Sequence, residues 1–281
     1  MRSTGRLGVA AVMTVGVALT ALTALAPATA HSLSAITPTV VAANPALPGA
    51  VFGISTHGKL ALAASKAPIS TSTAARIRLA LGAVLALPTA ADRNFGVSSA
   101  IPRGTVVRGI FIRGTTVTVD LNSTFAVGSS LSLQQRTGQF VFTLTAIPGV
   151  ERVAFRINGH AVTRVGINGQ FVGAGVGPTA FSRVTPAALV LSTRPGTHVT
   201  TPIRVSGVAT SFEAVVHWRL TTLSGTLLRQ GTTMATSNLR GNFTISIPTT
   251  YHGSVHLVVG GDAPRGDVPM NDPAVTPLFV E

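Results

Sequence analysis

The chain has 281 residues, of which 46% are hydrophobic and 10% charged, and its net charge is +13. A hydrophobic share this high supports the presence of real hydrophobic cores. The chain has no cysteine, which excludes disulfide bonds, thiolate metal sites and attachment as a lipoprotein through an N-terminal Cys.

The first 30 residues have the pattern of a secretory signal peptide. Arg2 and Arg6 precede an uncharged run rich in Ala, Val and Leu at 7–26, and Ala-Thr-Ala at 28–30 is a small-residue cleavage site. We therefore expect a secreted or cell-envelope protein, extracytoplasmic, that starts at His31 after cleavage behind Ala30. The alternative is an uncleaved N-terminal membrane anchor, since a run of about 20 apolar residues is long enough to cross a bilayer.

Removal of 30 from the 281 residues leaves 251, a length that fits two domains. Residues 31–48 are rich in Ser, Thr, Ala, Val and Pro and are predicted to form a flexible lead. A first domain is predicted at 49–165, a glycine-rich linker at 166–186 and a second domain at 187–281.

The first domain is predicted to combine two helices with a small mixed sheet, an α+β fold. Its clearest signal is a helical repeat of apolar residues that Pro148-Gly149 stops, followed by an alternating strand that Asn158-Gly159 closes. The predicted elements are strands at 51–54 and 60–62, a helix at 70–87, a polar loop at 89–100, a hairpin of strands at 106–112 and 117–121, a helix from Ser129 or Ser130 to 147, and a strand at 152–157.

The second domain is predicted to consist of strands and turns, an immunoglobulin-like β-sandwich. The even positions from Phe212 to Leu220 form one apolar face that includes Trp218. The predicted strands lie at 189–191, 203–208, 212–220, 227–230, 242–247, 254–259 and, as a last edge strand, 277–280.

The charge is concentrated in the first domain. Residues 31–185 hold 13 lysines and arginines against Asp92, Asp120 and Glu151, whereas residues 186–281 hold six against five acidic residues. Outside a membrane, a basic domain meets anionic lipid head groups and anionic wall polymers. The alternative is a compositional bias, because 19 of the 21 basic residues are arginines and they are scattered. Nucleic acid is not an expected partner, since one Trp and one Tyr offer few stacking surfaces.

Two groups of side chains resemble metal ligands only by spacing. If the strand is extended to residues 251–259, His252 and His256 share it and lie about 13 Å apart, too far for one metal ion. Asp262, Asp267 and Asp272 do not have the spacing of a helix–loop–helix calcium site. We interpret these acids as part of a solvated loop, with a loose cation site as the alternative.

Other motifs also favour structural interpretations. The glycines at 173–178 lack the lysine and the following helix of a phosphate loop, so this run is interpreted as a flexible connector. Asp120 is expected to hold a turn and Glu151 to pair with an arginine; a glycosidase would need both in one cleft. Trp218 is expected in the core, and Arg-Gly-Asp at 265–267 is a short triplet that arises by chance. No catalytic, cofactor-binding or metal-binding residue and no cofactor is therefore predicted.

Residues of about 50–165 resemble the GerMN domain of bacterial sporulation and spore-germination proteins. The matching segments are IPRGTVVRGIFIRGTTVTVDLNSTF at 101–125 and QFVFTLTAIPGVERVAFRINGH at 139–160. The family usually has Gly-Pro soon after the first helix, whereas Leu87-Pro88 here lacks the glycine.

Residues of about 187–281 resemble the immunoglobulin-like domain of bacterial spore germination. The matching segments are TTPIRVSGVATSFEAVVHWRL at 200–220 and GNFTISIP at 241–248. The tandem order of the two domains also occurs in that family.

These resemblances imply a non-enzymatic, exported cell-envelope protein of the sporulation and germination type. It would act through protein–protein interaction or assembly, with an envelope protein or with itself, because GerMN domains resemble ring-building modules that pack side by side. The alternative is a binding module for anionic cell-wall polymer or a membrane surface. Many carriers of these domains do not sporulate, so sporulation of the host is not inferred.

Overall fold

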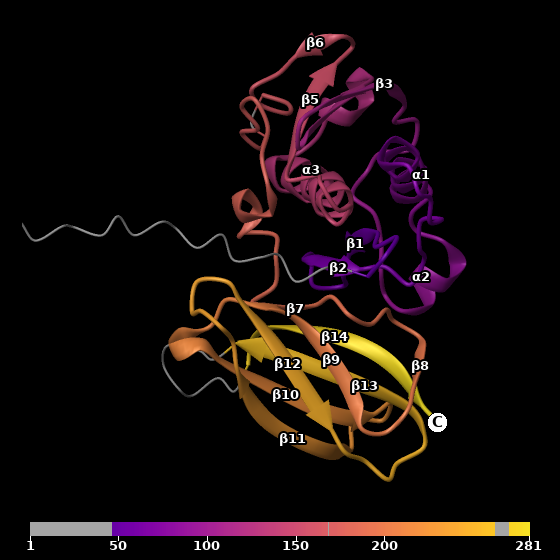
Figure 1. Ribbon diagram of the computed structural model, residues 1–281, viewed down its shortest axis with the longest axis vertical. Coiled ribbons are helices and arrows are strands. Elements are labelled where there is room, and N and C mark those ends of the chain that lie inside the picture. Colours follow the sequence, from indigo (N-terminus) through magenta and orange to yellow (C-terminus); the bar gives the residue numbers. More distant parts are fainter. Residues whose placement is uncertain (1–46, 168, 262–269) are drawn as a thin grey trace, which may run out of the picture. The chain divides into compact units, whose positions relative to one another are not determined.

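The computed structural model describes residues 47–167, 169–261 and 270–281 (Figure 1). The signal peptide predicted at 1–30 and nearly all of the lead predicted at 31–48 lie outside these residues. In the described part of the chain, no helix has the length and apolar character needed to span a membrane.

The first domain has the predicted order of strand, strand, helix, hairpin, helix and strand, with short elements added. Its elements are β1 (Phe52–Ile54), β2 (Leu60–Leu62), α1 (Thr73–Leu85), α2 (Ala90–Asn94), β3 (Val107–Arg113), β4 (Thr116–Leu121), the 3-10 helix η1 (Ser123–Ala126), α3 (Ser130–Thr145), β5 (Arg152–Ile157), β6 (His160–Ala161) and the 3-10 helix η2 (Pro178–Phe181).

Helix α3 is the centre of this domain, with α1 and the β1–β2 pair packed against it (Figure 1). Strands β3, β4, β5 and β6 form one mixed sheet in this order, in which β4 and β5 are parallel. A parallel pair needs a long crossover, and α3 provides it. The aromatic rings of Phe125, Phe140 and Phe155 lie between α3 and this sheet, with centroids 5.0–6.4 Å apart.

The prediction of a single small sheet covered by two helices is wrong in one respect, because β1 and β2 form a separate two-stranded sheet. Side chains of α3 form hydrogen bonds with backbone groups of β1 that would otherwise be available to pair with another strand. Thr143 Oγ1 accepts a hydrogen bond from Phe52 N at 3.0 Å, and Gln139 Nε2 donates one to Phe52 O at 3.2 Å. These bonds attach β1 to the helix instead of to the sheet.

The polar loop predicted at 89–100 contains the short helix α2. Thr89 caps its start, and Asp92 completes a capping box by accepting from the Thr89 backbone N. The usual capping-box sequence has Glu or Gln at its fourth position, whereas this chain has Asp there, so the sequence pattern did not predict a helix.

The described residues of the segment at 166–186 pack on the first domain, including the glycine run at 173–178 that was expected to be a flexible connector. Val176 exchanges two backbone hydrogen bonds with Val153 of β5, at 2.9 and 3.0 Å. Val172 and Phe181 are at most 1% exposed and belong to the core of the first domain. The glycines allow close backbone approach, since a Cβ on Gly169 would lie 1.7 Å from Val165 O.

The second domain is the predicted β-sandwich. One sheet has the strand order β11-β10-β13-β14-β8 and the other has the order β12-β9-β7. Its elements are β7 (Ala188–Val190), β8 (Thr197–Val199), β9 (Ile203–Ala209), the 3-10 helix η3 (Phe212–Ala214), β10 (Val215–Thr222), β11 (Leu227–Met234), β12 (Gly241–Ile247), β13 (Gly253–Gly261) and β14 (Asn271–Val280).

Two predicted features of the sandwich are wrong. The strand predicted at 212–220 begins only at Val215, because Glu213 and Ala214 have positive φ angles of 53° and 62° that turn the chain and leave Phe212 54% exposed. The last strand, β14, is not at an edge, since β8 pairs with it in parallel. The three residues of β8 follow a proline–glycine turn and are too few to show an alternating pattern.

Candidate functional site

The most distinctive exposed surface in the first domain is the outer face of its four-stranded sheet. We call Phe111 and Arg113 of β3 together with Arg152 and Arg156 of β5 the basic sheet face. On β5 the alternate residues Val153 and Phe155 are buried on the side of the sheet that faces α3, and the register places Phe111 and Arg113 of β3 on the opposite side together with Arg152 and Arg156. The four residues of the basic sheet face therefore point away from the core.

Phe111 is held in an exposed position by a neighbouring arginine. Its side chain is 51% exposed, and the guanidinium carbon of Arg156 lies 5.2 Å from the centre of its ring. A guanidinium over an aromatic ring is an attractive cation–π contact. Arg156 Nε also donates to Gly159 O at 2.9 Å, and Arg152 Nε donates to Gly175 O at 3.1 Å. These bonds fix the orientation of both arginines.

Beside this face runs the free edge of β3. Within the part of the chain that the structure describes, β4 is the single strand hydrogen-bonded to β3. The hairpin is closed by the two-residue turn Gly114-Thr115, so Arg113 and Thr116 form a hydrogen-bonded pair and the pairs alternate from there. Consequently the backbone N–H and C=O groups of Ile110 and Ile112 point away from β4. Ile112 is also 46% exposed.

The two acidic residues near this face hold turns and do not form a catalytic pair. Asp120 is 8% exposed and its Oδ1 accepts from Gly159 N at 2.9 Å, which confirms its expected role at the turn. Glu151 accepts from the Thr115 hydroxyl at 3.1 Å, where an arginine was expected. Asp120 is paired with Arg156, five residues after Glu151, so the two acids lie about 16 Å apart along the parallel strands. A paired-acid glycosidase site needs both in one cleft.

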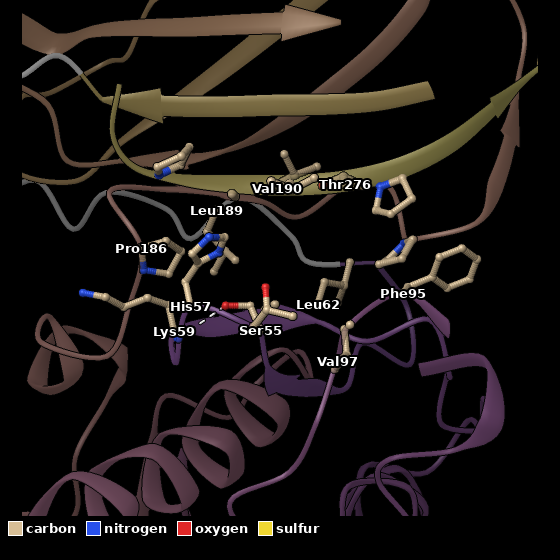
Figure 2. A pocket seen from close by; sticks show the side chains of 18 of the residues that line it. Ser55, His57, Lys59, Leu62, Phe95, Val97, Pro186, Leu189, Val190 and Thr276 are labelled. Atoms are coloured by element: carbon tan, nitrogen blue, oxygen red, sulfur yellow. Dashed lines mark hydrogen bonds between the residues drawn. The ribbon is translucent and has the colours of Figure 1, made fainter. Parts of the chain in front are cut away.

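A hollow lies where the two domains meet (Figure 2). Its volume is about 350 Å³. Its lining includes His57, Leu62 and Phe95 from the first domain and Leu189 and Thr276 from the second. The lining is largely apolar. The hollow lies along the contact between the two domains, and its lining does not point to a particular catalytic or ligand-binding chemistry.

Contacts around this hollow join the two domains closely. Leu60 N donates to Val184 O at 2.7 Å, and Leu47 N donates to Leu191 O at 3.3 Å. Leu189 and Leu191 are buried in the same cluster as the core of the first domain. The described residues of both domains accordingly belong to one compact unit.

Two buried charged side chains stabilise loops of the first domain. The carboxylate of Asp92 is fully buried and accepts from Ser65 and Thr89. Burial alone raises the pKa of Asp92, but the hydrogen bonds outweigh it and the pKa lies below its usual value. Arg136 Nη1 donates to the carbonyls of Phe125 and Val127, and burial lowers the pKa of this guanidinium.

The remaining predicted residues are not brought together. The prediction that His252 and His256 share a strand is wrong, because β13 begins at Gly253; His252 precedes it and is exposed, whereas His256 lies within it. Among the residues that the structure describes, no three His, Cys, Asp or Glu side chains are grouped closely enough to hold a metal ion. Trp218 is half-buried and packs against the core of the sandwich.

The structure does not test the interpretations of the three aspartates and of the Arg-Gly-Asp triplet. Asp262, Asp267 and the triplet at 265–267 lie outside the described residues, and the side chain of Asp272 is likewise not described.

The basic sheet face was not singled out by the sequence analysis, although its strands were predicted. The signal was the alternation itself, which places Phe111 and Arg113 on one face of β3 and Arg152 and Arg156 on one face of β5. Sequence alone did not show that these two strands flank β4 in one sheet.

Comparison with known proteins gives two adjacent family matches. Residues 59–163 match a family described as "Germane: Sporulation and spore germination", and residues 188–267 match the "Immunoglobulin-like domain of bacterial spore germination". No curated protein matches the chain significantly.

Solved structures with a similar fold include two from the sporulation protein GerM of Bacillus subtilis. Its first GerMN domain is 20% identical, with 46% of this chain and 95% of that chain covered and a TM-score of 0.37. Its tandem GerMN domains are 14% identical, with 72% and 61% covered and a TM-score of 0.40. At these scores the structural likeness adds nothing to the assignment. The two family matches, in the order that the fold shows, identify residues 59–163 as a domain of the sporulation and spore-germination type and residues 188–267 as an immunoglobulin-like domain of bacterial spore germination.

Proposed function

We propose that this chain is an exported, non-enzymatic cell-envelope protein that acts by docking to a protein partner through the basic sheet face. The observation that carries the proposal is the exposed Phe111 ring under Arg156, on a surface with two further arginines. Aromatic residues and arginine are enriched in protein interfaces and among the residues that dominate binding energy. The close contact between the two domains favours the sandwich as a rigid support for this face.

Site-specific photo-crosslinking in cells tests this docking surface. A photo-reactive amino acid replaces Phe111, and a matched control carries it at Leu223, which is 61% exposed on the sandwich. We expect defined protein adducts from position 111 and none from position 223. Equal labelling at both positions, or no adduct at position 111, would contradict the proposal.

Export is a separate part of the proposal and rests on the signal-peptide pattern of the first 30 residues. Cell fractionation followed by mass spectrometry of the N-terminal peptide tests it. We expect the protein outside the cytoplasm with His31 as its first residue. An intact N-terminus in the membrane fraction would favour the uncleaved anchor, and a cytoplasmic protein would refute export.

A second candidate function is binding to anionic cell-wall polymer or a membrane surface, which the excess of basic residues in the first domain favours. Binding by charge alone weakens steeply with salt. Light-scattering chromatography of residues 31–281 at low and high salt tests for self-association, and sedimentation with wall polymer or anionic vesicles tests this alternative. Binding that depends on the arginines but not on Phe111 would favour the polymer or membrane.

A further inference from the structure

The free edge of β3 has the properties of a binding site for an additional strand. We propose that it binds an extended, acidic segment of a partner protein, which adds to the four-stranded sheet beside β3. This inference rests on the proposed docking function and names the chemistry of the partner.

The backbone of β3 provides the first part of the argument. The outward N–H and C=O groups of Ile110 and Ile112 can form four hydrogen bonds with an incoming strand. Natural proteins usually protect such an edge, because it is a template for pairing with another chain. Strand addition at an exposed sheet edge is a known mode of peptide recognition, in which main-chain bonds supply affinity.

The side chains of the strand provide the second part. Ile112 is 46% exposed although it lies on the core side of the sheet, and Phe111 is 51% exposed on the other side. An incoming strand would cover both with its own side chains, since directly opposite residues on paired strands lie about 5 Å apart. β3 therefore has uncovered apolar surface on each face at its free edge.

The charge of the edge determines which partner fits. Arg108 and Arg113 are both exposed and stand near the two ends of β3, and the strand has no acidic residue. Two copies of β3 paired antiparallel would bring arginine near arginine at both ends, which disfavours a second copy of this chain. Acidic side chains about 16 Å apart on an extended segment would instead match both arginines. The arginines thus select an acidic partner and oppose self-pairing.

Fluorescence anisotropy with labelled synthetic peptides tests the inference on the full chain. The probe is a short peptide with an alternating valine–threonine core flanked by glutamates, and the matched probe has lysines in place of the glutamates. We expect the acidic peptide to bind at least about tenfold more tightly than the basic one.

Three variants locate the binding. Ile112→Pro removes an outward N–H that does not bond to β4, so the hairpin persists while binding weakens by about tenfold or more. Arg113→Glu reverses the preference between the two peptides. Arg78→Glu makes the same charge change at an exposed residue of α1 and leaves binding unchanged. Circular dichroism and thermal unfolding check that each variant is folded.

Several results would overturn the inference: no binding of the acidic peptide, equal binding of both peptides, undiminished binding by folded Ile112→Pro, or an equal loss in Arg78→Glu. The photo-crosslinks at Phe111 separate this inference from the proposed function. If the adducts persist unchanged in Ile112→Pro, docking stands and strand addition is wrong. If position 111 of the unaltered chain gives no adduct, the docking function itself fails.

Discussion

Asp92 offers the sharpest test of how the first domain is stabilised. Its carboxylate accepts hydrogen bonds from Ser65 N at 3.0 Å, Ser65 Oγ at 2.9 Å, Thr89 N at 2.9 Å and Thr89 Oγ1 at 2.6 Å. Three of these four bonds reach Oδ2. Asp92→Asn keeps the shape of the side chain but cannot accept from all four donors, because one carboxylate oxygen is replaced by an NH₂ group, which is itself a donor.

The cost of this substitution follows from the donors that lose their acceptor. A buried backbone N–H without a partner costs about 1–3 kcal/mol, and loss of a capping side chain costs about 1 kcal/mol. Ser65 and Thr89 are only half-buried, so water replaces part of what is lost. We expect Asp92→Asn to lower the free energy of unfolding by about 1–3 kcal/mol at neutral pH, and Asp92→Ala by about 2–4 kcal/mol.

The effect should depend on pH with a definite sign. The pKa of Asp92 is lowered in the folded protein, so its ionised form stabilises the fold fully above the unfolded-state value of about 4. This contribution is lost as the pH falls through the lowered pKa. The difference in stability between the native chain and Asp92→Asn should therefore shrink in acid.

Urea unfolding at neutral pH and near pH 3 measures this difference. Glu151→Gln is the matched control, because the Glu151 side chain is exposed and accepts a hydrogen bond from the Thr115 hydroxyl that an amide oxygen can also accept; we expect a change within about 0.5 kcal/mol. Equal midpoints for the native chain and Asp92→Asn at neutral pH would refute the reasoning. So would a gap that stays constant as the pH falls.

Two further substitutions test the packing of each domain. Gln139→Leu removes the oxygen that accepts from Ala100 N at 2.8 Å and the NH₂ group that donates to Phe52 O at 3.2 Å. We expect the free energy of unfolding, measured by chemical denaturation, to fall by about 2–4 kcal/mol. A decrease below about 0.5 kcal/mol would contradict the attachment of β1 to α3. In the sandwich, Gly231→Ala places a Cβ 2.6 Å from Trp218 Cζ2, so the indole must move. We expect a lower unfolding temperature and an altered tryptophan fluorescence spectrum; an unchanged spectrum would show that the ring is not packed on β11.

Local patterns were sufficient to predict most elements of this fold. Apolar spacing and stop signals placed α3, β5 and the turn at Asn158-Gly159, because each depends on residues close together in the chain. The alternating residues of β3 and β4 predicted their hairpin in the same way. The identity of both domains likewise followed from continuous segments.

Features that depend on distant residues could not be predicted. The glycines at 166–186 looked like a connector, yet Val172 and Phe181 from that segment complete the core, because glycine lets the backbone approach closely. Asp92 is a separate case of the same kind, since one of its two partner residues, Ser65, lies 27 positions away in the chain.

The candidate site shows the same contrast between features that local sequence determines and features that depend on distant residues. The sequence by itself determined that β3 is an alternating strand with arginines near its ends, since that pattern is local. Only the tertiary structure decided that β3 is an edge strand, that Arg156 reaches the Phe111 ring, and that Asp120 and Glu151 stand at opposite ends of parallel strands. Sheet order and register arise from packing between segments far apart in the chain, and one sequence does not encode these in any local pattern.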